Sequence, residues 1–190
     1  MSRLVRCVAV LAALLLSAVG SVPAGAGSIE IGPKVGTKIP APLSFRSADG
    51  AAKGFADVVG EKGVVMVFTR SAAWCPFCQA QMKELKSIVP ALADKGYRLV
   101  TVSYDEPEVL AAFSAKNAIP YIMLSDKGSV AIDAFGIRDP QYKEGSKAFG
   151  VPQPAIFIVG RDGVVRAKLA EEGFKVRPSP EAVLAAVTDR

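Results

Sequence analysis

The feature that most constrains the fold of this chain is a strand pattern that leads, through a short loop, into two cysteines at the start of a helix. The run Val64–Phe68 is continuously apolar, as expected for a strand covered on both faces of a sheet. The stretch Trp74–Cys78 follows, with the sequence Trp-Cys-Pro-Phe-Cys, and apolar residues recur at helical spacing after Pro76. We therefore predict a strand–motif–helix unit that carries two thiols.

The residues of the motif predict its geometry. Cys75 stands where a helix N-cap would, and Pro76 suits the first helical position because it has no N–H to lose and a fixed backbone angle. The sulfur of Cys75 would then face free backbone N–H groups and the positive end of the helix dipole, which both favour the thiolate. We expect Cys75 to attack, and Cys78, one turn later and more shielded, to take the second step.

A pair of cysteines spaced in this way has other common interpretations. Structural zinc needs about four protein ligands, and the chain has no histidine and no second cysteine pair. Covalent haem attachment requires a histidine directly after the second cysteine, where Gln79 stands. A passive crosslink stays open, but so small a ring adds little stability through loop entropy. The pattern favours a redox-active Cys75–Cys78 disulfide and predicts neither a metal nor a cofactor.

The first residues have the layout of a secretory signal peptide. Two arginines come before an apolar run over residues 8–19, and small residues end at Ala26. We predict a signal peptide in residues 1–26 and an exported domain, periplasmic or secreted, in residues 27–190. The apolar run is shorter than the ~20 residues that cross a bilayer, so stable membrane insertion after cleavage is not expected; an uncleaved anchor is the alternative. Cleavage would remove Cys7, leaving only the cysteines of the motif.

Length and composition fit one globular domain after this segment. A chain of 190 residues that is 51% hydrophobic can bury a core without disulfide staples. The formal net charge of +5 falls by two on cleavage, because the segment contains two arginines and no acidic residue. The remaining basic residues are interspersed with acidic ones and form no basic run. We therefore expect no nucleic-acid partner.

The rest of the chain predicts strands and helices that alternate around the strand–motif–helix unit. Besides a hairpin over residues 43–55 that turns at Asp49-Gly50, the predicted strands are 64–68, 99–102, 121–124, 155–159 and 164–169. The predicted helices are 76–92, 107–116, 129–135 and 180–187. Pro90 should kink or split the first helix, and Asp105 is the predicted N-cap of the second. Residues 136–154 form an unusually long connection and are a candidate cover for the active site.

These residues resemble the thioredoxin-like superfamily, particularly its bacterial alkyl hydroperoxide reductase/thiol-specific antioxidant-like branch, also called peroxiredoxin-like or redoxin. The resemblance covers most of the predicted mature chain and is carried by Val64–Phe68 with Trp74–Cys78, Val102–Asp105 with Pro107–Glu108, Leu124–Asp126 and Pro152–Val159. It implies an α/β, thioredoxin-like fold with a central mixed β-sheet flanked by α-helices and an N-terminal hairpin extension.

The resemblance also implies a set of supporting residues around the two cysteines. Trp74, Pro76 and Phe77 belong to the motif, where Trp74 would shield the sulfurs and offer a docking surface or, alternatively, be a core aromatic residue. Pro154 matches a proline that thioredoxin-like proteins hold in the cis form at the start of the strand facing the cysteine pair. Pro152 is its rival for that position.

Two departures concern the peroxiredoxins. These enzymes hold peroxide with a Thr or Ser three residues before the reactive cysteine, but Ala72 occupies that place and Ser71 stands one position too early. They also use an Arg close to the position of Pro154. Arg70 is the only nearby substitute in the sequence, and its alternative interpretation is a solvated loop charge.

A third departure concerns the thioredoxins. They keep a buried Asp that assists proton transfer at the position where Val67 stands. The proton acceptor for Cys78 is therefore unassigned, with Glu84 a weak candidate that is more typical of a surface residue.

We predict an exported thiol–disulfide oxidoreductase in which Cys75 attacks a substrate disulfide and Cys78 resolves the mixed disulfide, reduction of the substrate being the favoured direction. Its partners would be a disulfide-containing protein or a small thiol, and an upstream electron donor. One alternative is a thiol-dependent peroxidase that takes a peroxide substrate, with Cys75 peroxidatic and Cys78 resolving. Another is a non-catalytic binding module that retains the fold and an inert disulfide.

Overall fold

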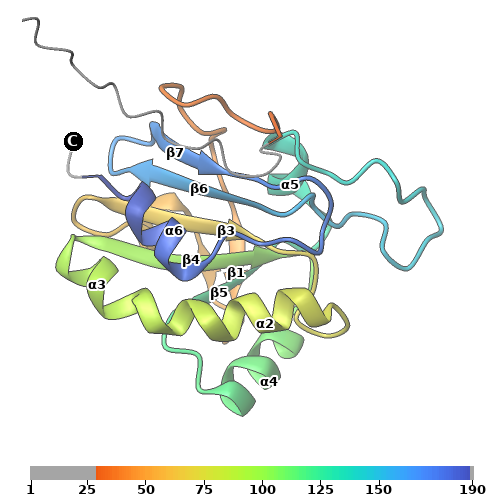
Figure 1. Ribbon diagram of the computed structural model, residues 1–190. Coiled ribbons are helices and arrows are strands. Elements are labelled where there is room, and N and C mark those ends of the chain that lie inside the picture. Colours follow the sequence, from red (N-terminus) through yellow and green to blue (C-terminus); the bar gives the residue numbers. More distant parts are fainter. Residues whose placement is uncertain (1–28, 189–190) are drawn as a thin grey trace, which may run out of the picture.

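The computed structural model describes residues 29–188, and the predicted signal peptide, residues 1–26, lies outside the described residues. Within residues 29–188, the chain forms a seven-stranded sheet with the order β2-β1-β5-β4-β3-β6-β7 (Figure 1). The strands are β1 (Phe45–Ser47), β2 (Ala52–Lys53), β3 (Gly63–Phe68), β4 (Tyr97–Ser103), β5 (Ile122–Ser125), β6 (Ala155–Gly160) and β7 (Val165–Leu169). The helices are α1 (Phe55–Val58), α2 (Pro76–Glu84), α3 (Val89–Asp94), α4 (Pro107–Asn117), α5 (Val130–Ala134) and α6 (Pro180–Ala186).

The sheet is mixed, as the sequence predicted. Strands β3, β4 and β5 are parallel, while β6 runs antiparallel to β3 and β7 antiparallel to β6. The β1–β2 hairpin turns at Asp49-Gly50 and joins the far edge, where β1 pairs antiparallel with β5. The predicted central strand, hairpin extension and closing β6–β7 hairpin are all confirmed.

Both faces of β3 are covered, which explains its unbroken apolar sequence. Val65 and Val67 pack in the apolar cluster that contains side chains of α2, α3, α4 and α6. Val64, Met66 and Phe68 point to the opposite face and pack against side chains of α1 and α5. Figure 1 shows α2, α3, α4 and α6 on one side of the sheet and α5 on the other.

Gly63, where β3 begins, is required by the close approach of its neighbours. A Cβ atom at this position would clash with the carbonyl oxygen of Val159 in β6 and with the ring of Tyr97 in β4. A glycine therefore allows β3 to pair closely on both sides.

The predicted helix 76–92 is split. Helix α2 ends at Glu84, a 3₁₀ turn covers Leu85–Ile88, and α3 begins at Val89 with Pro90 in its first turn. Proline is tolerated in a first turn because its missing N–H would have had no intrahelical partner. The prediction that Pro90 kinks or splits the helix is confirmed.

The predicted cap of α4 is wrong by one residue. Glu106 is the N-cap, and its side chain makes no capping hydrogen bond. The carboxylate of Asp105 instead accepts hydrogen bonds from Ser71 and Ala72 in the loop before the cysteines and from Ser103 at the end of β4.

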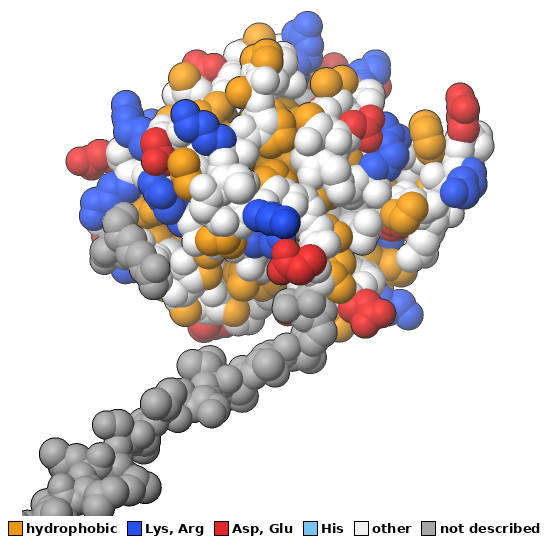
Figure 2. Space-filling model, turned by 90° about the horizontal axis from the view of Figure 1, so that it is seen from above, with side chains coloured by type: hydrophobic (Ala, Val, Ile, Leu, Met, Phe, Trp, Pro, Cys, Tyr) orange, Lys and Arg blue, Asp and Glu red, His pale blue; other side chains and the backbone are white. Residues whose placement is uncertain are grey.

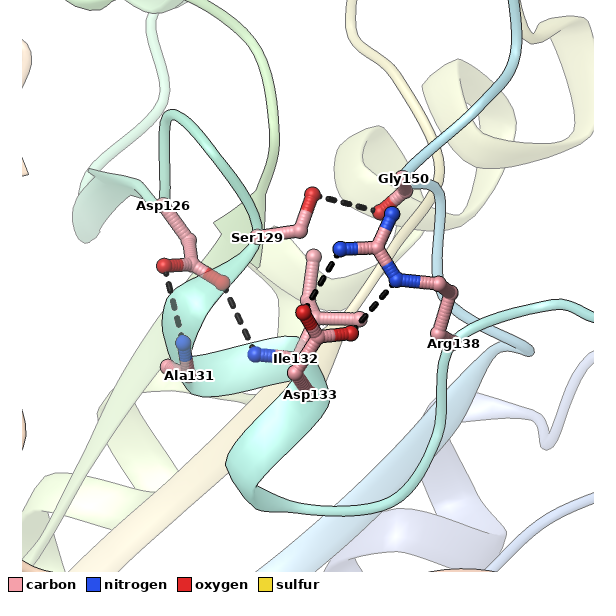
Figure 3. Close-up of polar contacts among 7 residues, drawn as sticks. All are labelled: Asp126, Ser129, Ala131, Ile132, Asp133, Arg138 and Gly150. Carbon is pink, nitrogen blue, oxygen red and sulfur yellow. Dashed lines mark hydrogen bonds and ion pairs between the residues drawn. The ribbon is translucent and has the colours of Figure 1, made fainter. Parts of the chain in front are cut away.

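The long connection 136–154 is tied to α5 and its preceding turn near both of its ends (Figure 3). The guanidinium of Arg138 forms an ion pair with the carboxylate of Asp133, and the Ser129 hydroxyl donates a hydrogen bond to the carbonyl oxygen of Gly150 at 2.8 Å. The carboxylate of Asp126 accepts two hydrogen bonds from backbone N–H groups in the first turn of α5, at 3.0 and 2.8 Å. Burial raises the pKa of Asp126 above its ordinary value, although these N–H groups oppose the shift.

The surface carries charges of both signs. On the face drawn in Figure 2, Lys and Arg side chains alternate with Asp and Glu side chains, as the interspersed sequence pattern predicted. Among residues 29–188 no helix is long and apolar enough to cross a bilayer.

Candidate active site

The two cysteines lie where β3 leads through a loop into α2. Cys75 is the N-cap of α2, Pro76 is its first residue, and Cys78 forms a disulfide with Cys75. The backbone N–H of Cys78 donates to Sγ of Cys75 at 3.3 Å. The predicted capping geometry is confirmed, and the first sulfur receives a hydrogen bond from the helix N-terminus.

Both sulfur-bearing residues are buried. Cys75 is 2% exposed and Cys78 is 0% exposed. The expected order, with Cys78 the more shielded, holds by too small a margin to separate the roles of the two sulfurs. A reactant that attacks either sulfur needs the covering side chains to move.

Two aromatic residues of the motif, one directly before each cysteine in the chain, are exposed. Trp74 is 44% exposed, so its interpretation as a core residue is wrong, and Phe77 is 39% exposed. The indole N–H of Trp74 donates to the Tyr104 hydroxyl at 3.0 Å, and that hydroxyl donates to the carbonyl oxygen of Lys147 at 3.0 Å. Phe77 meets Phe174 edge to face, with ring centroids 6.0 Å apart. The long connection and the segment after β7 therefore both reach the motif.

Arg70 is not a solvated loop charge. It is 3% exposed, and its guanidinium lies 4.2 Å from the ring centroid of Phe174, 5.0 Å from that of Tyr142 and 5.1 Å from that of Trp74. Its Nη2 atom donates to the Tyr142 hydroxyl at 2.6 Å. Stacking on three aromatic rings stabilises a cation that is removed from water, and it brings three segments of the chain together at the site.

A second arginine contacts the disulfide directly. Nη2 of Arg177, in the segment between β7 and α6, lies 3.6 Å from Sγ of Cys78. Burial, with a smaller contribution from the nearby positive charge of Arg70, lowers the pKa of Arg177 to about 10. In residues 29–188 neither arginine forms an ion pair with a carboxylate. The sequence offered no signal for Arg177, because 99 positions separate it from Cys78.

Asp105 holds the loop that precedes the motif, and this role was also missed. Its buried carboxylate accepts hydrogen bonds from the Ser71 hydroxyl at 2.7 Å, from the backbone N–H of Ala72 at 2.6 Å and from the Ser103 hydroxyl at 2.9 Å. The Ser71 oxygen also accepts from the backbone N–H of Ala73 at 3.0 Å. The hydroxyl of Ser71 is therefore already engaged and is not free to bind a substrate.

The position three residues before Cys75 offers no side-chain donor. Ala72 is buried, and its carbonyl oxygen accepts a hydrogen bond from the side-chain amide of Gln79 at 2.8 Å. Polar side chains therefore bind both the N–H and the carbonyl oxygen of Ala72, while the place of the peroxide-binding hydroxyl of peroxiredoxins is filled by a methyl group.

Pro154 is buried directly before β6 and lines a small cavity together with Gln81 and Arg177. The expected cis bond is wrong for both prolines, since within residues 29–188 the only cis peptide bond precedes Pro42. The backbone before β6 is held extended, because the N–H of Gln153 donates to the carbonyl oxygen of Ile137 at 2.7 Å and Pro152 forms a β-bridge with the same segment.

The two residues considered for proton transfer lie apart from this role. Val67 is fully buried in the apolar cluster that contains both cysteines, and Glu84 is exposed at the last turn of α2. The charged group that contacts Cys78 is the cation Arg177. Among residues 29–188 there is no group of three or more His, Cys, Asp or Glu side chains that could hold a metal ion.

Comparison with known proteins places the chain in a family. The AhpC/TSA family model matches residues 35–168, which include the motif, the central strands and all but the last residue of the β6–β7 hairpin. This chain belongs to the AhpC/TSA family. The AhpC/TSA protein is 29% identical over 130 residues to a putative peroxiredoxin of Mycobacterium tuberculosis H37Rv, covering 68% of this chain and 80% of the relative. It is 25% identical over 123 residues to peroxiredoxin Bcp of Escherichia coli K12, covering 65% of this chain and 77% of the relative.

Solved structures confirm the predicted thioredoxin-like fold. Peroxidoxin BcpB from Mycobacterium tuberculosis superposes with a TM-score of 0.68 at 20% identity and covers 80% of this chain and 95% of its own. Reduced Prx3 from Vibrio vulnificus in complex with H₂O₂ superposes with a TM-score of 0.69 at 22% identity, covering 81% and 98%. Family membership and the peroxiredoxin relatives together support a redox enzyme.

Proposed function

We propose that this AhpC/TSA protein is a thiol–disulfide oxidoreductase whose redox couple is Cys75 and Cys78. The observation that carries the proposal is the Cys75–Cys78 disulfide within the first turn of a regular α2. Because Cys75 is the N-cap and Cys78 lies one turn later, the ring opens and closes without unwinding the helix. A small, buried disulfide with the cation of Arg177 3.6 Å from one of its sulfurs suits reversible exchange better than passive crosslinking.

The reaction consists of two exchange steps. The Cys75 thiolate attacks one sulfur of a substrate disulfide, whose S–S bond breaks, and one half of the substrate leaves as a thiolate. The Cys78 thiolate then attacks Sγ of Cys75 and releases the second half as a thiolate. Two electrons pass to the substrate, and the Cys75–Cys78 disulfide remains. A dithiol donor reverses these steps on the enzyme and restores the reduced pair.

The second candidate is a thiol peroxidase, which family membership and the peroxiredoxin relatives favour. In this reaction the Cys75 thiolate attacks the O–O bond of a peroxide, forming a sulfenic acid and releasing water or an alcohol after protonation. The Cys78 thiol then condenses with the sulfenic acid, releasing water and forming the disulfide. The engaged hydroxyl of Ser71 and the methyl group of Ala72 argue for disulfides over peroxides as the better substrates.

The two candidates are separated by rates measured on one preparation of the purified protein with dithiothreitol as the donor. We expect the wild type to accelerate the reduction of insulin disulfides by dithiothreitol, an acceleration that Cys75→Ser abolishes, and we expect Cys78→Ser to accumulate a mixed disulfide at Cys75. In the full-length chain, which still contains Cys7, Cys7→Ser is the matched control and should behave as the wild type. Equal rates for the wild type and Cys75→Ser would refute the proposal. Fast hydrogen peroxide consumption beside slow disulfide reduction would favour the peroxidase.

We also propose that the protein is exported to the periplasm or secreted. The support is the sequence pattern of residues 1–26, with two early arginines, an apolar run and small residues before the cleavage point. Fractionation with intact-mass measurement should find a chain that begins at Gly27 outside the cytoplasm. A full-length chain in the membrane fraction would support an anchor instead, and a full-length chain in the cytoplasm would refute export.

A further inference from the structure

The uncharged disulfide has a partly buried arginine, Arg177, against Cys78, and a buried one, Arg70, stacked on the neighbouring Trp74. Arg70 lies in the loop after β3 and Arg177 in the segment before α6, and the Nε atom of each is buried without a hydrogen-bond partner. The two guanidinium groups repel each other, since the charge of Arg70 contributes to the lowered pKa of Arg177. Neither has a carboxylate partner in residues 29–188. Charges in such surroundings are costly unless an anion compensates them.

The redox reaction of the two cysteines itself produces an anion that can compensate the charge of Arg177. Opening the disulfide generates a thiolate on Cys75 or Cys78, next to the guanidinium of Arg177 in the case of Cys78. Nη2 of Arg177 already lies 3.6 Å from Sγ of Cys78, and a cation within about 4–6 Å of an acid lowers the pKa of that acid by roughly 1–3 units. The sulfur of Cys75 receives a backbone N–H hydrogen bond, and within residues 29–188 no guanidinium forms a hydrogen bond with it.

The other charged and titratable groups around the motif do not compete for this role. Both carboxylate oxygens of Asp105 are used by the loop before the motif. On α2 itself, Lys83 and Glu84 are exposed in its second half. The hydroxyls of Tyr104 and Tyr142 hydrogen-bond to Trp74 and Arg70. In the segment of Arg177, Glu171 lines the small cavity with it but forms no ion pair with it, and Glu172 and Lys175 are exposed.

We propose that Arg177 is a catalytic residue that holds Cys78 as the leaving thiolate and so directs an attacking thiol to Sγ of Cys75. The inference rests on the proposed redox cycling of the two cysteines. A donor thiolate forms a bond to Sγ of Cys75, the Cys75–Cys78 bond breaks, and its electron pair stays on Cys78 beside the guanidinium. A sulfur whose thiol has a lower pKa leaves faster, so charge decides between two sulfurs that burial does not distinguish. Cys78 then needs no carboxylate as a proton acceptor.

The same contact sets the redox equilibrium. The guanidinium of Arg177 stabilises the reduced form, which contains the thiolate, and it stabilises the neutral disulfide much less. Removing the charge should therefore move the equilibrium with dithiothreitol toward the disulfide. A tenfold change in that equilibrium constant corresponds to about 30 mV for a two-electron couple.

The test measures the pKa of one thiol at a time, so it does not depend on turnover. In Cys75→Ser protein, the rate at which iodoacetamide alkylates Cys78 is measured as a function of pH. Circular dichroism checks that each preparation is folded. The additional change Cys7→Ser removes the third thiol from the full-length chain. We expect the pKa of Cys78 to lie below the ordinary thiol value of about 8.5 and to rise by at least about 1 unit in Arg177→Gln. Arg177→Lys, which keeps the charge, should restore part of the shift and covers the case in which Arg177→Gln fails to fold.

Two controls separate a catalytic charge from a structural one. Arg166→Gln removes an exposed arginine of the β6–β7 hairpin that pairs with Asp162, and it should leave the pKa of Cys78 unchanged. In Cys78→Ser protein, Arg177→Gln should shift the pKa of Cys75 less than it shifts that of Cys78 in Cys75→Ser. An unchanged pKa of Cys78 in folded Arg177→Gln, or an equal shift at both cysteines, would overturn the assignment. A shift at Cys78 in a protein without disulfide reductase activity would sink the proposed function alone.

Discussion

The carboxylate of Asp105 is the part of the site whose removal has the most directly calculable effect. Asp105→Ala deprives the Ser71 hydroxyl, the Ala72 backbone N–H and the Ser103 hydroxyl of their common acceptor. A buried donor left without a partner costs about 1–3 kcal/mol. The two hydroxyls can rotate toward other acceptors, but the backbone N–H cannot, so the sum is not reached. We expect the free energy of unfolding to fall by about 3 kcal/mol.

Urea denaturation of the oxidised protein measures this loss. With a slope of about 2 kcal/mol/M, the midpoint should fall by about 1.5 M urea. Dithiothreitol should also reduce the disulfide faster, because the loop that precedes it is no longer held. Asp49→Ala is the matched control, since Asp49 likewise accepts from a serine hydroxyl and a backbone N–H, but on an exposed turn. A midpoint shift for Asp105→Ala no larger than that for Asp49→Ala would refute the reasoning.

Three further outcomes follow from particular positions. Ala72→Ser should raise the rate of hydrogen peroxide consumption about tenfold relative to disulfide reduction, because it supplies a donor beside Cys75; an unchanged ratio of the two rates would contradict this. Gly63→Ala should lower the free energy of unfolding by at least about 2 kcal/mol through its clash between strands, against about 1 kcal/mol for Gly50→Ala, which has open space but a positive φ; thermal or urea unfolding that ranks them the other way would count against the packing argument. Because burial raises the pKa of Asp126, its contribution to stability is full below its ordinary pKa of 3.8 and is lost as pH rises through the higher folded-state value. The urea midpoint should therefore fall with rising pH between about pH 4 and 7, and Asp126→Asn should remove this decrease. An unaltered decrease would show that another group causes it.

The proposed chemistry depends on surroundings that neither the peroxiredoxin nor the thioredoxin pattern contains. The position of the peroxide-binding hydroxyl is filled by Ala72, and the position of the buried Asp of thioredoxins is filled by Val67. In their place the site has two arginines from distant segments. The family therefore predicts the fold and the class of redox chemistry, while the local substitutions decide which substrate is favoured.

Local sequence patterns were sufficient for the framework. The continuous apolar run of β3, the proline in the first turn of α2 and the proline that splits α2 from α3 each act through the backbone of their own segment. Hydrophobic periodicity and the turn residues before β2 and β7 also predicted the hairpins that close both edges of the sheet. Such features are visible in the sequence because their physical cause lies within a few residues.

The cation environment of the disulfide was decided by the tertiary structure alone. In the sequence, Arg70 has the pattern of an ordinary loop charge and Arg177 that of a surface residue. In the folded chain, Tyr142 and Phe174 pack against Arg70, and Arg177 contacts Cys78 in the first turn of α2. Asp105 has the spacing of a helix cap, yet three donors brought close by β3 and β4 take its carboxylate instead. By itself, the sequence determined that two thiols lie at a helix start. Only the packing of distant segments decided which charges surround them, because burial and long-range contact leave no periodic trace in the chain.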